Sequence, residues 1–354
     1  MMKNPIKVLV VDDSAIIRDA IISALESEEE IKVIATATNG KEAIDLIPEL
    51  KPDIVTMDIV MPIMDGLQAT EHIMAYHPTP IIVITSLLPK DMEIAFKALN
   101  SGALDVIERP NISELLNPAS KKRKQLIDKV KILVNVKVIT HLGGRLLKKE
   151  KEFLESTPTP SEAKFKIIGI ASSTGGPKTV RKILSKLPVD FPIPIVIVQH
   201  ISDGFTKGLV DWWNNECAIE IREGKDGERL NKGTVYVAPS FVHMTVTKNE
   251  RIKLEDTPPV GGHKPAGNVL LTSVAQAYQD SAMGIILTGM GDDGAIGIKA
   301  IKDAGGFTIA QDEKTCAIFG MPKVSIEMGG VDKILPLDEI PDEIMRRIKS
   351  RSGR

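Results

Sequence analysis

The sequence predicts an α/β protein of two doubly wound parallel-sheet domains, one over residues 5–124 and one over residues 164–350, joined by a linker over residues 125–163. In both halves, short apolar runs alternate with amphipathic stretches, a pattern typical of parallel strands joined by crossover helices. Polar residues of chemical interest follow many of these apolar runs directly. Between the halves, proline, glycine and charged residues interrupt the pattern, as expected for a connecting segment.

Composition and charge restrict the functional classes. The chain has 354 residues, 43% of them hydrophobic and 26% charged, which suits two or three globular domains. A formal net charge of −2 and an aromatic content of 4% argue against a nucleic-acid partner. No apolar run reaches the roughly 18 residues of a membrane span, and the opening MMKNPIKVLVVDDS is expected to be a first strand, not a signal peptide. Only Cys217 and Cys316 are cysteines, which fits a reducing compartment. We expect a cytoplasmic protein without direct membrane insertion.

In the N-terminal half, each apolar run ends before a helical or turn pattern. Strands are expected at Ile6–Val11, Lys32–Ala37, Ile54–Met57, Ile81–Thr85 and Asp105–Ile107, and helices at Ile16–Leu25, Lys41–Leu50, Leu67–Tyr76 and Pro89–Ser101. Ligands of open α/β sheets bind at the carboxyl ends of the strands. Residues at those ends are therefore candidates for a site.

The residues at these strand ends are Asp12, Asp13, Asp58, Thr85 and Arg109. Three converging carboxylates repel one another without a cation, and oxygen ligands favour Mg²⁺. The sequence therefore predicts a Mg²⁺ site, with one carboxylate left free to attack phosphorus. Any single aspartate could instead cap a helix, but their grouping at successive strand ends favours a site.

Residues 5–124 resemble a two-component receiver domain, which has a flavodoxin-like fold, in the segments VDDS, MDIVMPIMDG, ITS and RP. The resemblance implies that Asp58 is the phospho-acceptor and that Asp12 and Asp13 are the acidic pair for Mg²⁺. It implies that Thr85 is the switch hydroxyl. Arg109 replaces the family's usual lysine; its forked guanidinium can still pair with a phosphoryl oxygen, so we expect altered phosphorylation or switching kinetics with function retained.

The segment between the halves begins with the basic cluster Lys121–Lys124, followed by a partial helical stripe from Leu126 to Val138. The later run Thr157–Ser161 is proline-rich and polar, which predicts an exposed linker. The basic cluster could contact nucleic acid, but a solvated helix face is the more common reason for such a run. Part of this long segment is expected to pack between the domains.

The C-terminal half repeats the α/β alternation. Strands are expected at Lys166–Ala171, Ile195–Gln199, Ile219–Arg222, Thr234–Ala238, Gly284–Thr288 and Gly306–Ala310, a hairpin at Val242–Thr247 and Arg251–Leu254, and helices at Lys178–Lys186, Phe205–Asn214, Val269–Asp280, Ala295–Ala304, Pro322–Met328 and the charged tail.

Three chemically distinct side chains follow strands of this half: Ser173, His200 and Asp293. In the turn Ser172–Gly176, two glycines permit a tight bend and Pro177 favours a helix start, so free N–H groups lie beside the Ser173 hydroxyl. A serine nucleophile needs an adjacent base, an imidazole can accept its proton near neutral pH, and a carboxylate can orient the imidazole. These residues form a candidate triad.

Other residues compete for two of these roles. His243 lies in the expected hairpin and His263 in an expected flexible loop, whereas His200 alone follows an apolar strand in parallel register with Ser173. Asp292 is the obvious competitor for the orienting carboxylate.

This half resembles the catalytic domain of chemotaxis-type protein-glutamate methylesterases in the segments ASSTGGP, VQHISDGFT, VYVAPSFVHM, HKPAGNVLLTS and LTGMGDDGAIG. The resemblance implies Ser173 as nucleophile, His200 as base and Asp293 as orienting acid. It implies that Thr174, His243 and Met290 line the site, with the Met290 N–H as an oxyanion donor. The chain departs from the usual residues at Ser172 (commonly glycine), Pro177 (threonine) and Asn268 (aspartate), and Ala171 replaces the first glycine of a G-x-S-x-G turn.

The two resemblances together imply a phosphorylation-regulated serine hydrolase. It would demethylate glutamate methyl esters, and deamidate glutamines, on methyl-accepting chemotaxis receptors, countering a receptor methyltransferase. A chemotaxis histidine kinase would be the phosphodonor, Mg²⁺ would serve the receiver, and the hydrolase would need no cofactor. Unphosphorylated, the receiver would cover the Ser173 edge, and the roughly −1.5 to −2 charges of a phosphoryl group would weaken that packing.

Two alternatives remain at this point. A binding module could hold a phosphate or nucleotide at the helix start after Ser172–Gly176 and would need neither His200 nor Asp293. A signalling adaptor with a vestigial hydrolase site would keep the fold without the chemistry. A DNA-binding output is disfavoured because no helix-turn-helix pattern follows the receiver.

Overall fold

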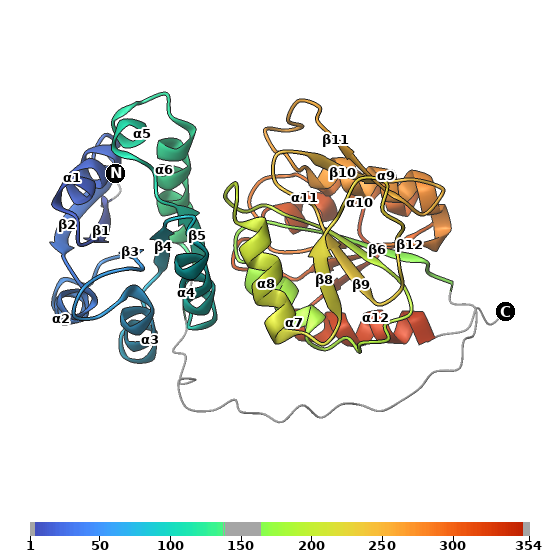
Figure 1. Cartoon of the computed structure of the whole chain (residues 1–354), viewed down its shortest axis with the longest axis horizontal. Helices are drawn as coiled ribbons and strands as arrows, with labels where there is room; N and C mark the ends of the chain where they lie inside the picture. Colours follow the sequence, from blue (N-terminus) through green and yellow to red (C-terminus); the bar gives the residue numbers. More distant parts are fainter. Residues whose placement is uncertain (1–3, 137, 139–163, 350–354) are drawn as a thin grey trace. The chain divides into compact units, whose positions relative to one another are not determined.

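The computed structural model describes residues 4–136, 138 and 164–349, which fall into two compact units (Figure 1). The first unit holds the described residues up to 138 and the second holds those from 164. Each has its own parallel sheet, which confirms the predicted fold class. The expected proline-rich linker segment Thr157–Ser161 lies outside the described residues.

The sheet of the first unit has the strand order β2-β1-β3-β4-β5, and every strand pair is parallel. Its strands are β1 (Ile6–Val11), β2 (Ile31–Ala37), β3 (Ile54–Asp58), β4 (Ile81–Thr85) and β5 (Asp105–Glu108), each within one residue of its predicted bounds. Every residue of β3 and β4 is buried, as expected for central strands covered on both faces.

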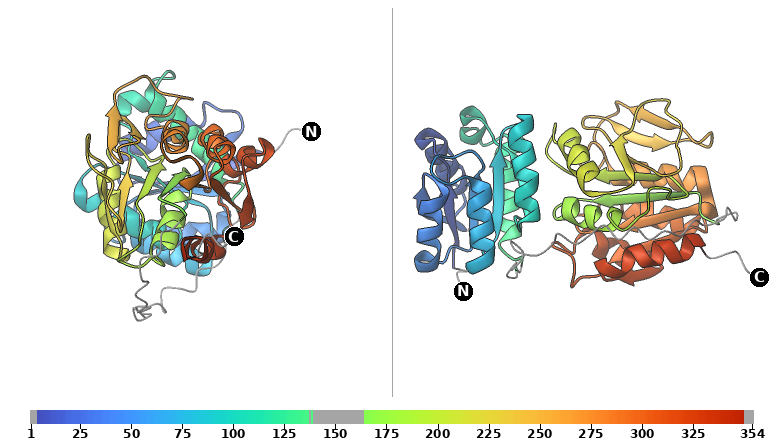
Figure 2. Two further views of the ribbon diagram at one scale, coloured as in Figure 1. Left: turned by 90° about the vertical axis from the view of Figure 1, so that its right-hand side faces the viewer. Right: turned by 60° about the horizontal axis from the view of Figure 1, so that its bottom comes forward.

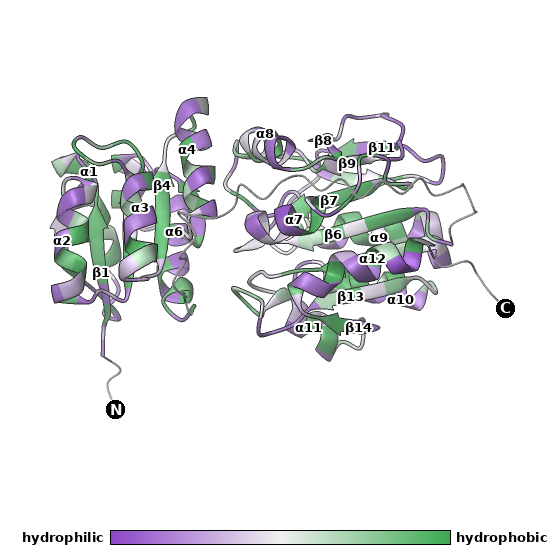
Figure 3. Ribbon diagram, turned by 90° about the horizontal axis from the view of Figure 1, so that it is seen from below, coloured by the Kyte–Doolittle hydropathy of each residue, from purple (hydrophilic) through white to green (hydrophobic). Residues whose placement is uncertain are grey.

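Helices cover both faces of this sheet (Figures 1 and 2). They are α1 (Ala15–Leu25), α2 (Gly40–Leu50), α3 (Gly66–Tyr76), α4 (Pro89–Asn100), α5 (Ile112–Leu116) and α6 (Lys121–Leu133). Helix α1 packs with α5 and α6, while α3 packs with both α2 and α4. Figure 3 shows β1 and β4 as hydrophobic ribbons between helices whose colours alternate between polar and apolar.

The first unit extends beyond the expected boundary at residue 124. Helix α6 buries Leu126, Val130 and Leu133, and Lys131 forms an ion pair with Glu28, 2.7 Å away. The apolar stripe that the sequence placed in the linker is therefore the inner face of a helix of the first unit. The basic cluster at its start conceals this amphipathic pattern because it fills the whole first turn with charge.

The second unit has a seven-stranded sheet of order β14-β13-β12-β6-β7-β9-β8, with all pairs parallel. Its strands are β6 (Ile167–Ser172), β7 (Ile195–Gln199), β8 (Glu220–Glu223), β9 (Thr234–Val237), β12 (Ala282–Ile286), β13 (Phe307–Gln311) and β14 (Lys333–Leu335). The chain builds outward from β6 in both directions, so β6 stands at the topological switch point, where α/β sheets bind ligands.

Helices again cover both faces of the sheet (Figure 2). Those of the second unit are α7 (Gly176–Leu184), α8 (Thr206–Glu216), α9 (Gly267–Tyr278), α10 (Ala295–Asp303), α11 (Met321–Glu327) and α12 (Ile340–Lys349). Helix α7 packs with α8 and α12, and α10 packs with α9 and α11. The predicted hairpin is confirmed as β10 (His243–Val246) and β11 (Ile252–Glu255), an antiparallel pair that forms a separate sheet.

Two short elements, α5 and β14, were not among the sequence predictions, because each is too short to show a period. Strand β12 begins and ends two residues before its predicted bounds. Thr288 thus lies outside the strand, where its hydroxyl donates to the Thr174 carbonyl. In the described part of the chain, no helix combines the length and apolar character that crossing a membrane requires.

Candidate functional site

Three polar side chains meet at the carboxyl edge of the second unit's sheet. Ser173 directly follows β6 and His200 directly follows β7. The pairing of Ser172 with Gln199 places these two residues side by side in the register, and the His200 N–H donates to the Ser172 carbonyl, 2.9 Å away. Asp293 lies in the loop after β12, the other neighbour of β6.

His200 and Asp293 are in contact. The His200 Nε2 lies 2.8 Å from the Asp293 Oδ2. Asp293 is only 2% exposed, and its carboxylate also accepts the backbone N–H groups of Gly267, at 2.5 Å, and Asn268, at 2.9 Å. Burial would raise the pKa of Asp293, but these donors, led by His200, hold the pKa below its usual value. The carboxylate therefore stays ionised.

This contact fixes the chemistry of the imidazole. Because Nε2 is the nitrogen 2.8 Å from the carboxylate, we assign the proton to Nε2 and the basic lone pair to Nδ1, which is buried and has no hydrogen-bond partner among the described residues. Within the described residues, the Ser173 hydroxyl also has no hydrogen-bond partner. An unpaired basic nitrogen and an unpaired hydroxyl on neighbouring strand ends are a base and a nucleophile that can be brought together by a substrate.

The turn after β6 holds Ser173 rigidly. Its N–H donates to the Thr288 carbonyl at 3.0 Å, and its carbonyl accepts from Gly176, the first residue of α7, at 2.8 Å. Gly175 adopts a φ of 76°, a conformation that favours glycine. The predicted strand–turn–helix geometry around Ser173 is therefore confirmed.

Two backbone N–H groups near the nucleophile are available as donors. A Cβ on Gly289 would lie only 2.8 Å from the Ser173 Cβ, so the Gly289–Met290 backbone passes directly beside the serine. Among the described residues, the N–H groups of Thr174 and Met290 form no hydrogen bond. Thr174 is buried and Met290 is 48% exposed. An oxyanion formed at Ser173 would thus have Thr174 and Met290 as candidate donors.

His243 is fully buried, and both ring nitrogens bind backbone groups. Its Nδ1 accepts from the Ala266 N–H at 3.2 Å, and its Nε2 lies 3.1 Å from the Pro258 carbonyl. The sequence resemblance placed His243 in the lining of the site, and in the structure both of its ring nitrogens contact the loop before α9. That loop leads into Gly267, which binds Asp293, so His243 is connected to the carboxylate through this loop.

His263 is the functional candidate that sequence reasoning set aside. Its ring stacks on that of His200, with centroids 4.0 Å apart and planes 6° apart. A tight turn holds it, because Val260 and His263 exchange two backbone hydrogen bonds across Gly261-Gly262. Burial, and secondly His200, lower the pKa of His263. The adjacent glycines were the available signal, since Gly-Gly favours a two-residue turn that fixes its flanking residues.

The predicted acidic site of the first unit is also assembled. Ligand oxygens of Asp12, Asp13 and Asp58 lie within 4.8 Å of one another. Arg109 forms an ion pair with Asp58 and lies 3.6 Å from Asp12. Burial raises the pKa of Asp58 to about 6 although Arg109 opposes the shift. Thr85 ends β4, the neighbour of β3, with its hydroxyl buried and unpaired.

These carboxylates fit a hard divalent cation. The Asp58 Oδ2 is buried and has no hydrogen-bond partner in the described part of the chain, a cost that a cation would remove. The acidic residues belong to the first unit and the candidate triad to the second.

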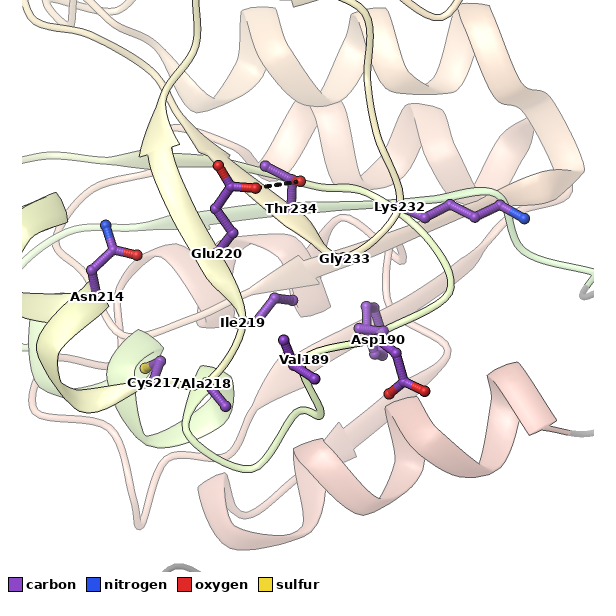
Figure 4. A pocket seen from close by; sticks show the side chains of 11 residues that line it. Val189, Asp190, Asn214, Cys217, Ala218, Ile219, Glu220, Lys232, Gly233 and Thr234 are labelled. Carbon is purple, nitrogen blue, oxygen red and sulfur yellow. Dashed lines mark hydrogen bonds between the residues drawn. The ribbon is translucent and has the colours of Figure 1, made fainter. Parts of the chain in front are cut away.

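A cavity of about 530 Å³ lies elsewhere, at the amino ends of β8 and β9 (Figure 4). Two of its polar side chains are occupied by neighbours: Glu220 accepts from the Thr234 hydroxyl, and Asn214 bonds both backbone groups of Ile221. It lies at the amino ends of the strands, the opposite edge of the sheet from Ser173.

Known proteins resemble the chain over its whole length. Residues 8–119 match the response regulator receiver domain family, and residues 168–344 match the family described as CheB methylesterase. A Methanococcus maripaludis protein named protein-glutamate methylesterase/protein-glutamine glutaminase is 42% identical over 99% of this chain and 100% of that protein. A protein of the same name from Archaeoglobus fulgidus is 42% identical over 96% and 97%. The crystal structure of the Thermotoga maritima CheB methylesterase catalytic domain is 38% identical, with a TM-score of 0.50, and covers 51% of this chain and 98% of that one.

Proposed function

The chain belongs to the CheB methylesterase family, and from that premise we propose that Ser173, His200 and Asp293 perform its hydrolysis. The enzyme is a protein-glutamate methylesterase with protein-glutamine glutaminase activity, and we propose that the receiver domain in the same chain regulates it. The observation that carries the assignment of residues is the 2.8 Å contact between His200 and Asp293 beside Ser173.

The proposed first step is acylation. The Ser173 hydroxyl gives its proton to the His200 Nδ1 as Oγ attacks the side-chain carbonyl carbon of a glutamate methyl ester. Asp293 stabilises the positive imidazolium, and the N–H groups of Thr174 and Met290 stabilise the oxyanion. Collapse breaks the ester bond, and the departing methoxide takes the proton from His200 and leaves as methanol.

Deacylation reverses these roles. His200 takes a proton from water, whose oxygen attacks the acyl carbon, and the Ser173 oxygen leaves with that proton. The net reaction adds one water and yields a glutamate side chain and methanol. With a glutamine side chain, the same sequence releases ammonia in place of methanol.

The test is methanol release from a methylated chemoreceptor preparation. We expect Ser173→Ala to lose activity by several orders of magnitude while keeping the wild-type fold. Full activity of that variant would reject Ser173 as the nucleophile and favour a phosphate-binding role for its turn. That rival role already has one observation against it, because the Ser172 hydroxyl is buried and occupied by Gln199.

We also propose that Asp58 is the phospho-acceptor. Asp12, Asp13 and Asp58 would hold Mg²⁺, whose charge offsets the carboxylates and an incoming phosphoryl group. Arg109 can pair with a phosphoryl oxygen, and the unpaired Thr85 hydroxyl can donate to it. A small phosphodonor with Mg²⁺ should increase methanol release by the wild type and leave Asp58→Asn at its basal rate.

The family implies chemoreceptor substrates and a kinase phosphodonor in general. We propose specifically methyl-accepting chemotaxis receptors and a chemotaxis histidine kinase, acting with the enzyme in the cytoplasm. Purified kinase and receptor, added to the enzyme with ATP, should reproduce the activation that a small phosphodonor gives.

A further inference from the structure

One buried carboxamide joins the backbone of the proposed nucleophile to that of the proposed base. Gln199, the last residue of β7, is 4% exposed. Its Nε2 donates to the Ser173 carbonyl at 2.7 Å and to the His200 carbonyl at 2.8 Å. The amide nitrogen of Gln199 thus binds the backbone of both Ser173 and His200, the two residues whose side chains are proposed to react together.

The orientation of this carboxamide follows from its partners. Carbonyl oxygens only accept hydrogen bonds, so the end of the side chain that faces Ser173 and His200 must be the nitrogen. The Gln199 Oε1 then faces Ser172, whose hydroxyl donates to it at 2.6 Å. Ser172 is fully buried. Both N–H bonds and the oxygen of the Gln199 carboxamide are therefore satisfied, which favours a single rigid arrangement.

The surrounding backbone is built around this group. A Cβ added to Gly176, the first residue of α7, would overlap the Gln199 Oε1. The carboxamide therefore fills the space between the end of β6, the end of β7 and the start of α7. The helix start, the nucleophile turn and the base are held by one side chain.

We propose that Gln199 is a positioning residue for hydrolysis: it fixes the Ser173 turn relative to His200, and Ser172 orients its carboxamide. The proposal rests on the roles of Ser173 and His200 proposed above. A shift of about 1 Å between reacting groups can cost about 10²-fold in rate, so two hydrogen bonds that set this spacing act on kcat.

The main test is Gln199→Met, which preserves length and removes both donors. We expect kcat for methanol release to fall about 10- to 100-fold with KM changed less than about threefold, since substrate contacts are untouched. Labelling of Ser173 by a fluorophosphonate, followed by mass spectrometry, should slow by a similar factor. The matched control is Tyr236→Phe, which removes a buried hydroxyl that binds the Arg229 carbonyl and the Asn231 N–H, away from the triad. It should lose stability and keep the wild-type kcat.

A second variant, Ser172→Ala, leaves Gln199 in place but removes its orienting donor. We expect a smaller, several-fold loss of kcat. The double variant should be no slower than Gln199→Met alone, because both substitutions act on the same hydrogen bonds of the Gln199 carboxamide. Should Gln199→Met fail to fold, Ser172→Ala carries the test through the same kcat and labelling measurements. Wild-type kcat and labelling in a folded variant, or additive losses in the double variant, would overturn the proposal. An active Ser173→Ala would instead overturn the proposed triad.

Discussion

The imidazole of His263 lies flat against that of His200, 4.0 Å between ring centroids. Burial and the neighbouring His200 lower the pKa of His263, so this ring is neutral at pH 7. A neutral flat ring limits rotation of His200 without competing for its proton. The carboxylates that face this pair are Asp293, buried, and Asp292, exposed.

We expect His263→Phe to keep kcat within about threefold, because the phenyl ring preserves the flat contact. His263→Ala should lower kcat several-fold, because a freely rotating base spends less time in the productive geometry. The measurement is methanol release at saturating receptor. Equal rates for the Phe and Ala variants would show that the stack does not matter.

The lowered pKa of His263 also predicts a pH dependence of stability. The unfolded chain, with an ordinary histidine pKa of about 6.5, binds a proton more readily than the folded chain. The contribution of His263 to the free energy of unfolding is therefore full above about pH 6.5. It is lost as the pH drops from there through the lower pKa of the folded state. Urea unfolding followed by tryptophan fluorescence reports on the second unit, because both tryptophans lie in α8. His263→Phe should flatten this slope between about pH 7 and 5, and an unchanged slope would contradict the assignment.

Asp293→Asn should lower kcat by about 10³- to 10⁴-fold, as expected when the group that orients a catalytic imidazole is neutralised. The chain offers a matched control in Asp292→Asn, the adjacent carboxylate, which is exposed. That variant should keep nearly full activity. The reverse outcome would assign the orienting role to Asp292.

Arg109→Ala should block activation by a phosphodonor and leave basal methanol release unchanged. The arginine belongs to the first unit and pairs with Asp58 and Asp12. Its loss removes the guanidinium that can pair with a phosphoryl oxygen on Asp58. Arg109→Lys should restore activation with different kinetics, since one ammonium replaces a forked donor. Phosphorylation is followed by intact-protein mass spectrometry, and normal activation of the Ala variant would remove Arg109 from the switch.

Phe241→Ala should raise KM for the receptor several-fold, with kcat unchanged. Phe241 is 60% exposed in the loop after β9, at the same sheet edge as the triad. Its neighbour Ser240 accepts the Gly204 N–H, which connects the loop of Phe241 to the loop after His200. Ile334→Ala, on edge strand β14 and 49% exposed, is the control. Identical KM values for the two variants would exclude a docking role.

The positions of Ser173 and His200 could be predicted from the sequence, because the end of each apolar run marks the carboxyl end of a parallel strand. Buried apolar runs ended just before Ser173 and His200, and the structure places Ser173 at the end of β6, the switch-point strand, and His200 at the end of its neighbour β7. Asp293 was harder, since it stands several residues beyond β12, and only its contact with His200 separates it from Asp292.

The remainder depends on tertiary contacts that no local pattern encodes. His263 reaches His200 only because a turn folds back over the edge. His243 carries no sign in the sequence that both ring nitrogens bind backbone. From the sequence, Gln199 is only the last residue of a buried strand. Its hydrogen bonds to the Ser173 and His200 carbonyls depend on the folded turns after β6 and β7.

The hairpin of β10 and β11 pairs with no strand of the large sheet in the described residues. It carries His243 at its first position, and through that ring it anchors the loop that bears His263. The loop that carries His263 is thus attached to a small sheet that is separate from the strands preceding Ser173 and His200. A substitution in the hairpin that displaces His243 is therefore expected to act on Gly267 and on His263, the partners of Asp293 and His200, while the large sheet keeps its strand order.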